Sequence, residues 1–237
     1  VYDTGPSPWK HALPWGDVTV KNNILFLSVF KWPASGKLHL PGLKTGIKSA
    51  KLLNGATSET LTPHTENGWT TFTLPPKAPE KLVSVIQVKL QGSPEVDPCF
   101  GLDPEVTTVI PSDFASVTGA TKKNKRWMEK FGEWRHCQQI SQWKPGGSAT
   151  WEVDVLNPGD YHVDLAYAGE NRLVWSVAVE GGETIQNQQN ASHNYQSFPI
   201  GWLNFPKPGK YKVSVACLDG NRDSASLKSI SFTAINS

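Results

Sequence analysis

The chain has 237 residues, which is enough for one large domain or two of ordinary size. Its formal net charge is +2 and only 19% of its residues are charged, so it lacks the basic balance of a nucleic-acid-binding protein. The only basic cluster, KKNKR at 122–126, is expected to be a solvated loop. No apolar run approaches the roughly 18 residues that a membrane-spanning helix needs. We therefore expect neither nucleic acid nor a membrane as a partner.

Strand patterns dominate from the N-terminus onward. Residues 24–30 (ILFLSVF) are apolar throughout, which is typical of a strand buried on both faces. In LVSVIQVKL at 82–90, one face carries Leu82, Ile86, Val88 and Leu90. Further runs alternate at 151–155, 161–167, 175–179 and 211–217. With 20 Gly and 18 Pro marking the turns, this period of two predicts an all-β chain with two consecutive antiparallel β-sandwich domains of jelly-roll type.

One segment departs from this pattern. Trp127–Cys137 (WMEKFGEWRHC) places aromatic residues at i, i+4 and i+7, which is a helical spacing, but Gly132 interrupts it. The segment is predicted to be either a short helix or an irregular aromatic loop.

A domain boundary is expected near residues 109–113. Four prolines punctuate the stretch before it, and a new apolar pattern begins at Phe114. The division predicts a first sandwich over 13–110, a second over 111–237 and a linker over 1–12.

Cysteine and histidine usage gives no sign of a metal site. Cys99, Cys137 and Cys217 cannot all pair and form no CxxC, which argues against a disulfide scaffold and a zinc ribbon. The six histidines show no HxH, HxxxH or HExxH spacing. We expect no transition metal.

The residues show no catalytic constellation either. Acidic residues are scattered over the predicted turns, and neither GxSxG nor GxGxxG occurs. No catalytic residue is assigned within this chain.

Ten tryptophans provide the main binding signal, because flat indole faces stack on the apolar face of a pyranose. Trp151 and Trp175 lie in phase with strand valines, which predicts core positions. Four others lie in loop-like surroundings, where a core position and a sugar-binding platform are both open as interpretations: Trp127, Trp134, Trp143 and Trp202.

The segment from Ser7 to Leu43 resembles a known family. Its motifs are Ser7-Pro8-Trp9, Pro14-Trp15-Gly16, Phe30-Lys31-Trp32-Pro33, Gly36-Lys37-Leu38 and Leu40-Pro41-Gly42-Leu43. In this order they resemble the segment after the catalytic barrel of α-L-fucosidases of glycoside hydrolase family 29.

This resemblance implies an exo-acting, retaining α-L-fucosidase whose Asp nucleophile lies on an N-terminal (β/α)8-like barrel outside this chain. The first sandwich would then pack against that barrel, with Trp9 and Trp15 as the docking residues. The start at Val1 agrees with a fragment of such an enzyme. The parent enzyme would be extracytoplasmic: periplasmic, secreted or lysosomal.

The second half has a weaker resemblance to carbohydrate-binding modules of families 6 and 35, carried by the pattern at Trp151–Ala168, by PGKYKVSVACLDGN and by LKSISF. Such modules use loop aromatics and an Asn near the last strand, a place that Asn221 occupies, although an Asn in a DGN turn is equally a structural residue. They often hold calcium near the first strand, where only Asp113 matches.

Three hypotheses stay open on the sequence alone. The chain is the non-catalytic half of a fucosidase, or a lectin-like protein that binds fucosylated or galactose-containing glycans, or a structural pair of sandwiches that supports a barrel or an oligomer.

Overall fold

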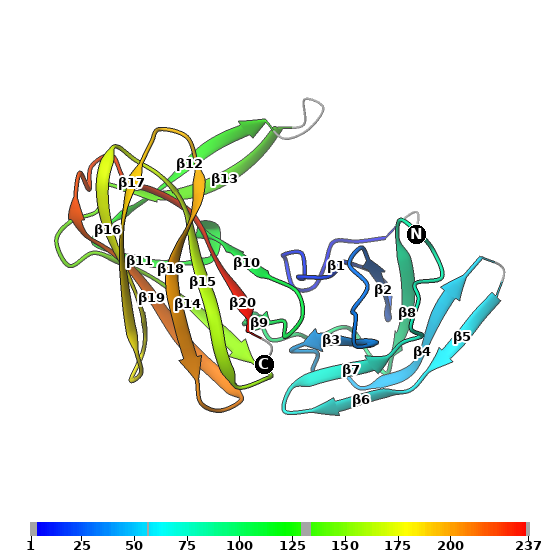
Figure 1. Cartoon of the computed structure of the whole chain (residues 1–237). Coiled ribbons are helices and arrows are strands. Elements are labelled where there is room, and N and C mark those ends of the chain that lie inside the picture. The colour runs from blue at the N-terminus through cyan, green and yellow to red at the C-terminus, as the bar shows by residue number, and fades with distance from the viewer. Residues whose placement is uncertain (1–3, 56, 129–133, 236–237) are drawn as a thin grey trace. The chain divides into compact units, whose positions relative to one another are not determined.

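The computed structural model describes residues 4–55, 57–128 and 134–235, without the side chains of 125–128 and 134–137. These residues form antiparallel strands and one short 3-10 helix, η1 (Ser112–Phe114) (Figure 1). The chain divides into two compact units, residues 1–106 and 107–237, which we call unit 1 and unit 2. The all-β antiparallel class predicted from the alternation is confirmed. No helix in the described ranges is long and apolar enough to cross a bilayer.

Unit 1 packs two sheets around one apolar core. Its strands are β1 (Gly16–Lys21), β2 (Ile24–Val29), β3 (Lys37–Pro41), β4 (Ile47–Asn54), β5 (Thr57–Leu61), β6 (Pro63–Glu66), β7 (Trp69–Thr73), β8 (Ser84–Leu90) and β9 (Phe100–Leu102). One sheet has the order β1-β2-β8-β4-β5 and the other β3-β7-β6. Leu27 and Ile86 from the first sheet share a buried cluster with Leu40 and Phe72 from the second.

Strand β8 follows the predicted alternation with one exception. Ile86, Val88 and Leu90 are buried, whereas Lys89 is exposed. Leu82, which we placed on the same face, is 85% exposed because β8 begins only at Ser84. Strand β2 also differs from its prediction: every second residue is buried and the others are half-buried, so only one face lies fully in the core.

Trp9 and Trp15 are core residues of unit 1. They are 2% and 1% exposed, and both belong to the buried cluster. The Trp9 indole N–H donates to the Pro41 carbonyl at 2.9 Å, and that of Trp15 donates to the His39 carbonyl at 2.8 Å. The expectation that these two side chains dock a separate barrel needs correction, because they join the N-terminal segment to β3 within their own unit.

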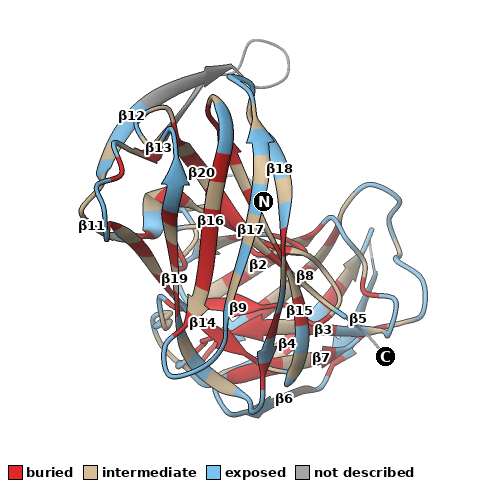
Figure 2. Cartoon of the chain, turned by 60° about the vertical axis from the view of Figure 1, so that its left-hand side comes forward, coloured by how far each residue is buried: buried red, intermediate tan, exposed pale blue. Residues whose placement is uncertain are grey.

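Unit 2 is a sandwich of two sheets. Its strands are β10 (Thr108–Pro111), β11 (Ser116–Thr118), β12 (Thr121–Met128), β13 (Trp134–Ser141), β14 (Ser148–Val155), β15 (Gly159–Ala168), β16 (Asn171–Val179), β17 (Thr184–Ala191), β18 (Gln196–Phe205), β19 (Gly209–Gly220) and β20 (Ser226–Ala234). One sheet has the order β12-β13-β20-β15-β18, and β10 also pairs with β20. The other has the order β11-β14-β19-β16-β17. Figure 2 shows buried residues along the strands and exposed ones on loops and edge strands.

Aromatic side chains fill the space between the sheets of unit 2. The ring of Tyr167 on β15 lies 5.0 Å from that of Trp175 on β16, and Trp143 meets Trp175 edge-on at 5.2 Å between centroids. Trp151 and Trp175 are buried, as predicted. Trp143 is 2% exposed, so it has no face free for a sugar and belongs to the core.

The aromatic segment 127–137 contains strands where we predicted a helix or a loop. β12 and β13 pair in antiparallel register, with Trp127 opposite Arg135 and Met128 opposite Trp134. Residues 129–133 lie outside the described part of the chain. The helical spacing of the aromatics is therefore accidental, because strand pairing decides the backbone at both tryptophans.

The Trp9 indole gives a first prediction. Trp9→Ala removes a large buried side chain and leaves the Pro41 carbonyl unpaired, so the free energy of unfolding of unit 1 should fall by about 3–5 kcal/mol. Urea unfolding followed by circular dichroism measures the loss. Phe30→Ala is the control, since Phe30 is 61% exposed and its removal should change stability by less than about 0.5 kcal/mol. Equal effects of the two variants would contradict this assignment.

The core of unit 2 gives a prediction at alkaline pH. Burial raises the pKa of the Cys217 thiol to about 12. The pKa of Tyr167 is also raised, chiefly by burial and to a smaller extent by the charge of Cys217. Unfolded chains lose these protons at lower pH than folded ones. The contribution of Cys217 to the free energy of unfolding is therefore complete below its unfolded pKa of 9.0, and it is lost as the pH rises toward 12. Urea midpoints should therefore fall steadily above about pH 9. Cys217→Ala should make that decline shallower, and an unchanged slope would refute the role of the thiol.

Candidate functional site

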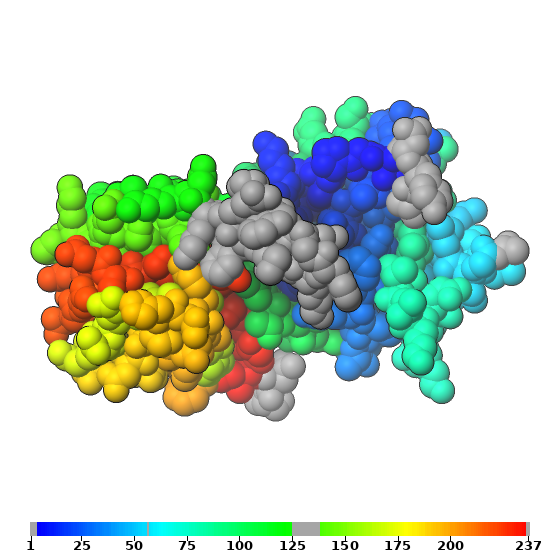
Figure 3. Space-filling model, turned by 90° about the horizontal axis from the view of Figure 1, so that it is seen from above, coloured from blue at the N-terminus to red at the C-terminus, as the bar shows by residue number. Residues whose placement is uncertain are grey.

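Three loops of unit 2 gather at one end of the sandwich. They are the β15–β16 turn around Glu170, the β17–β18 loop around His193 and the β19–β20 loop around Asn221. Figure 3, which looks at this end, shows their yellow, orange and red-orange atoms on one surface. Residues that are more than fifty positions apart in the sequence are thereby brought within hydrogen-bonding distance, as between Asn221 and Glu170.

The first two of these loops line an open hollow of about 270 Å³. It is lined by Gly169, Glu170, Asn171, Ala191, Ser192 and His193. We call it the loop-end hollow.

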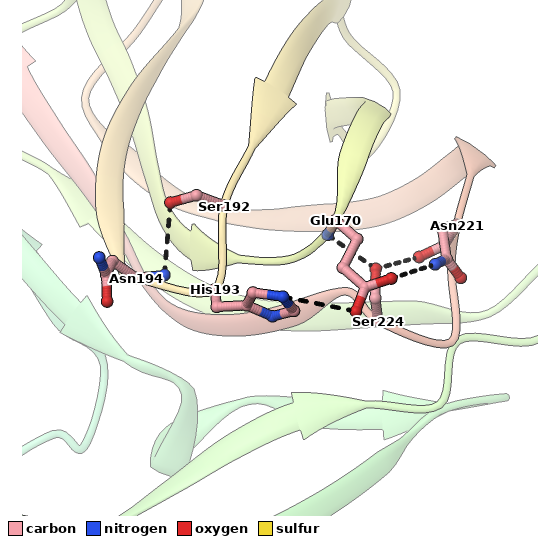
Figure 4. A network of polar contacts seen from close by, with 6 residues as sticks. All are labelled: Glu170, Ser192, His193, Asn194, Asn221 and Ser224. Carbon is pink, nitrogen blue, oxygen red and sulfur yellow. Dashed lines mark hydrogen bonds and ion pairs between the residues drawn. The ribbon is translucent and has the colours of Figure 1, made fainter.

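The Glu170 carboxylate stands at the centre of the polar contacts (Figure 4). One oxygen lies 3.6 Å from His193 Nε2, and the other accepts a hydrogen bond from the Asn221 side-chain amide at 3.1 Å. The Glu170 backbone N–H donates to Ser224 Oγ at 2.9 Å, and that hydroxyl donates to the Asn221 carbonyl at 2.7 Å. Ser224 thus joins the first and third loops and orients Glu170.

Backbone geometry positions these loops. Asn171 begins β16 with a φ of +59°, a conformation that Asn adopts more readily than most residues. Gly220 has a φ of +95°, and a Cβ there would lie 2.0 Å from the Arg172 carbonyl oxygen. Only glycine allows the β19–β20 loop to approach β16 this closely.

An ion pair links two neighbouring strands near these loops. Arg172 Nη1 lies 3.1 Å from Asp219 Oδ2. The pKa of Asp219 lies below its ordinary value, chiefly because its carboxylate accepts the Gly220 backbone N–H and secondly because of the Arg172 charge. Asp219 is therefore ionised at neutral pH, and the ion pair adds a side-chain link between the paired strands β16 and β19.

The side chains at the loop-end hollow offer both hydrogen-bond donors and hydrogen-bond acceptors. A carboxylate accepts only, a carboxamide donates and accepts, and an imidazole and a hydroxyl do both. His193 and Asn221 are exposed, so water or a ligand reaches them. Each Glu170 oxygen retains acceptor capacity beyond the contact it makes.

The sequence-predicted residues divide among several places. Asn221 is not among the residues that line the loop-end hollow, but its side-chain amide donates to Glu170, which does line it. Trp202 is 61% exposed but stands on β18, away from the three loops. Trp127 and Trp134 lie on the β12–β13 hairpin, and their side chains are outside the described part of the chain. Sequence reasoning missed Glu170, His193 and Ser224, and no spacing signal connects residues from loops so far apart.

Asp113 does not fit a calcium site. Its carboxylate accepts the Gln138 backbone N–H at 3.0 Å, so it joins η1 to β13. Within the described residues, no group of three or more His, Cys, Asp or Glu side chains is arranged to hold a metal ion. We derive no role for calcium.

The fold matches part of a known enzyme. The α-L-fucosidase from Vibrio sp. strain EJY3 superposes with a TM-score of 0.60 at 18% identity, over 98% of this chain and 42% of that one. This chain therefore spans less than half of the length of that enzyme. No protein-family model matches the sequence, and no curated protein does. The shared fold stands on structure alone.

Two carbohydrate-binding modules also align with about half of the chain. One is from Cellvibrio mixtus lichenase 5A in complex with cellotriose, at 13% identity and a TM-score of 0.43. The other is the C-terminal module of LamC from Zobellia galactanivorans, at 15% identity and a TM-score of 0.41. Each match covers 54% of this chain and 98% of the module. These scores are too low to establish a common fold.

The close approach at Gly220 can be tested. Gly220→Ala brings a Cβ against the Arg172 carbonyl and strains the backbone, so unit 2 should lose at least about 2 kcal/mol of stability. Gly181→Ala is the matched control: its φ is also positive, at +70°, but no atom lies within 4 Å of the added carbon. That variant should lose about 1 kcal/mol. Thermal unfolding measures both, and an equal loss in the two variants would disprove the steric role of Gly220.

Proposed function

We propose that this chain is the non-catalytic portion of an α-L-fucosidase and that unit 2 binds glycan at the loop-end hollow. The observation that carries the glycan-binding part is the Glu170 carboxylate held between Asn221 and His193 at an open surface. The parentage is supported by the fold shared with the Vibrio enzyme and by the motifs of residues 7–43. The parent enzyme would act outside the cytoplasm.

Within this proposal the segments have separate roles. Residues 1–12 connect to a catalytic barrel in the same polypeptide, residues 13–110 form the sandwich that supports it, and residues 111–237 form the glycan-binding module. Retaining hydrolysis of α-L-fucosyl linkages belongs to the barrel, and we assign no catalytic residue to this chain. Since Trp9 and Trp15 are buried in unit 1, a barrel would contact other, exposed residues.

The hollow suits a sugar for a physical reason. Each hydroxyl group on a pyranose can both donate and accept, and a carboxylate beside a carboxamide pairs with both roles. Hydrogen bonds to a charged group contribute more than neutral ones, about 1.5–3 kcal/mol each. Glu170 is therefore expected to contribute most to affinity, and Asn221 and Ser224 to its orientation.

Isothermal titration of the chain with L-fucose, galactose, N-acetyllactosamine and a fucosylated oligosaccharide tests this function. We expect binding by a fucose- or galactose-containing probe, and Glu170→Ala should weaken it about tenfold or more. Glu152→Ala removes the same charge from an exposed position on β14 and should leave affinity unchanged.

Three results would contradict the proposal. Absence of heat with every probe would remove the glycan-binding role, as would equal affinities of the Glu170→Ala and Glu152→Ala variants. Turnover of nitrophenyl fucoside by this chain alone would overturn its assignment as non-catalytic.

A further inference from the structure

Trp202 is an exposed indole on a polar sheet face. It is 61% exposed, and no other tryptophan whose burial the structure describes is classed as exposed. It lies on β18, an edge strand of its sheet. Single exposed apolar residues are common on protein surfaces, so exposure alone has no functional meaning. The backbone around it supplies the reason to look further.

An irregularity in β18 turns Trp202 outward. Phe198 and Ile200 face the core, with Phe198 stacked on Tyr167 and Ile200 4% exposed, and strict alternation would send Trp202 inward after them. The pairing with β15 shifts instead: Val163 faces Gly201 while the next residue, Asp164, faces Pro199. Leu203 and Phe205 are then the buried residues. One extra residue thus reverses the phase of the strand.

Polar side chains surround the indole on the same face. His162 is the register partner of Trp202, and their rings are 5.9 Å apart at an interplanar angle of 67°. His162 Nδ1 lies 3.4 Å from Asp164 Oδ2. On the other side, the Asn204 side-chain amide donates to Asp160 Oδ1 at 2.7 Å. Alternate residues of a strand share a face and lie roughly 7 Å apart. Two carboxylates, an imidazole and a carboxamide therefore flank the ring on this face.

We propose that Trp202 and its neighbours form a second glycan-binding surface, on which a pyranose stacks on the indole and its hydroxyls bond to His162, Asp164 and Asn204. A flat apolar ring bordered by a few fixed polar groups is the general form of a sugar site. A protein partner would instead need a contiguous apolar patch, and among the described residues of β15 and β18 no other large apolar side chain is classed as exposed.

This surface is separate from the loop-end hollow. Asn194 and Trp202 are eight residues apart along a largely extended strand, which corresponds to roughly 25 Å. The inference rests on the proposed function only in taking a glycan as the ligand. Two separated sites on one unit would bind a polymer more strongly than a short oligosaccharide, because the second contact becomes intramolecular.

Fluorine NMR of the chain labelled with 5-fluorotryptophan tests the second surface. Trp202→Phe identifies the Trp202 resonance by its loss, and the probes are a fucosylated oligosaccharide, N-acetyllactosamine and fucoidan, a fucose polymer. We expect a saturable shift of that resonance with at least one probe, and the shift should persist in Glu170→Ala. Trp202→Ala should weaken retention on fucoidan in affinity electrophoresis at least fivefold, and Trp202→Phe should weaken it less. Circular dichroism confirms that each variant is folded.

The outcomes separate the two proposals. A Trp202 resonance that stays fixed while Glu170-dependent binding is observed overturns the second surface and leaves the loop-end hollow standing. A shift that disappears in Glu170→Ala overturns it as well, because the indole would then report on the first site. The Trp202 resonance could instead shift with protein concentration and not with added sugar. If self-association is also lost in Trp202→Ala, the partner is a second copy of the chain. No response at either site overturns both proposals.

Discussion

Alternate burial along paired strands is the constraint on which the rest of unit 2 depends. Each strand sends every second side chain into the space between two sheets, where Tyr167, Trp175 and Trp143 pack ring against ring. Because the side-chain period is two, a shift of one residue moves a whole set of side chains to the other face. Strands β14, β15 and β16 keep their phase over their full length and form the core. Strand β18 changes phase once, and that change exposes Trp202 while Leu203 and Phe205 stay buried.

Unit 1 relies on a different link. Its N-terminal segment forms few strand pairs before β1, yet Trp9 and Trp15 are almost fully buried. Both indoles donate to carbonyls of β3, so each bulky ring also carries one directed hydrogen bond. The Pro-Trp motifs at Trp9 and Trp15, whose side chains we expected to dock a neighbouring module, instead stabilise the unit that contains them. A motif that resembles a family can reflect packing within a unit as readily as an interface.

Sequence reasoning predicts burial correctly where apolar residues alternate along one strand. It fails where a site is formed by segments that are distant in the sequence. The valines and aromatics of 151–155, 161–167 and 175–179 alternate in sequence and are buried in the structure. Spacing misled us at Trp127 and Trp134, which lie on two paired strands. It also misled us at Leu82, which precedes its strand. Glu170 and His193 were not predicted, because their loops meet only after the sandwich forms. The bulge beside Trp202 leaves no sequence signal beyond Gly201.

The two proposed glycan surfaces are complementary in chemistry. The loop-end hollow offers a carboxylate, an imidazole and a carboxamide, which select among hydroxyl arrangements but supply little apolar contact. The β15–β18 face offers an indole, which supplies apolar contact to any pyranose and little selection. Hydrogen bonds to the Glu170 charge contribute about 1.5–3 kcal/mol each, and covering an indole adds a hydrophobic gain of a different kind. Under this proposal, a module that combines both on one sandwich would obtain selection among hydroxyl arrangements from its loops and apolar contact from its sheet.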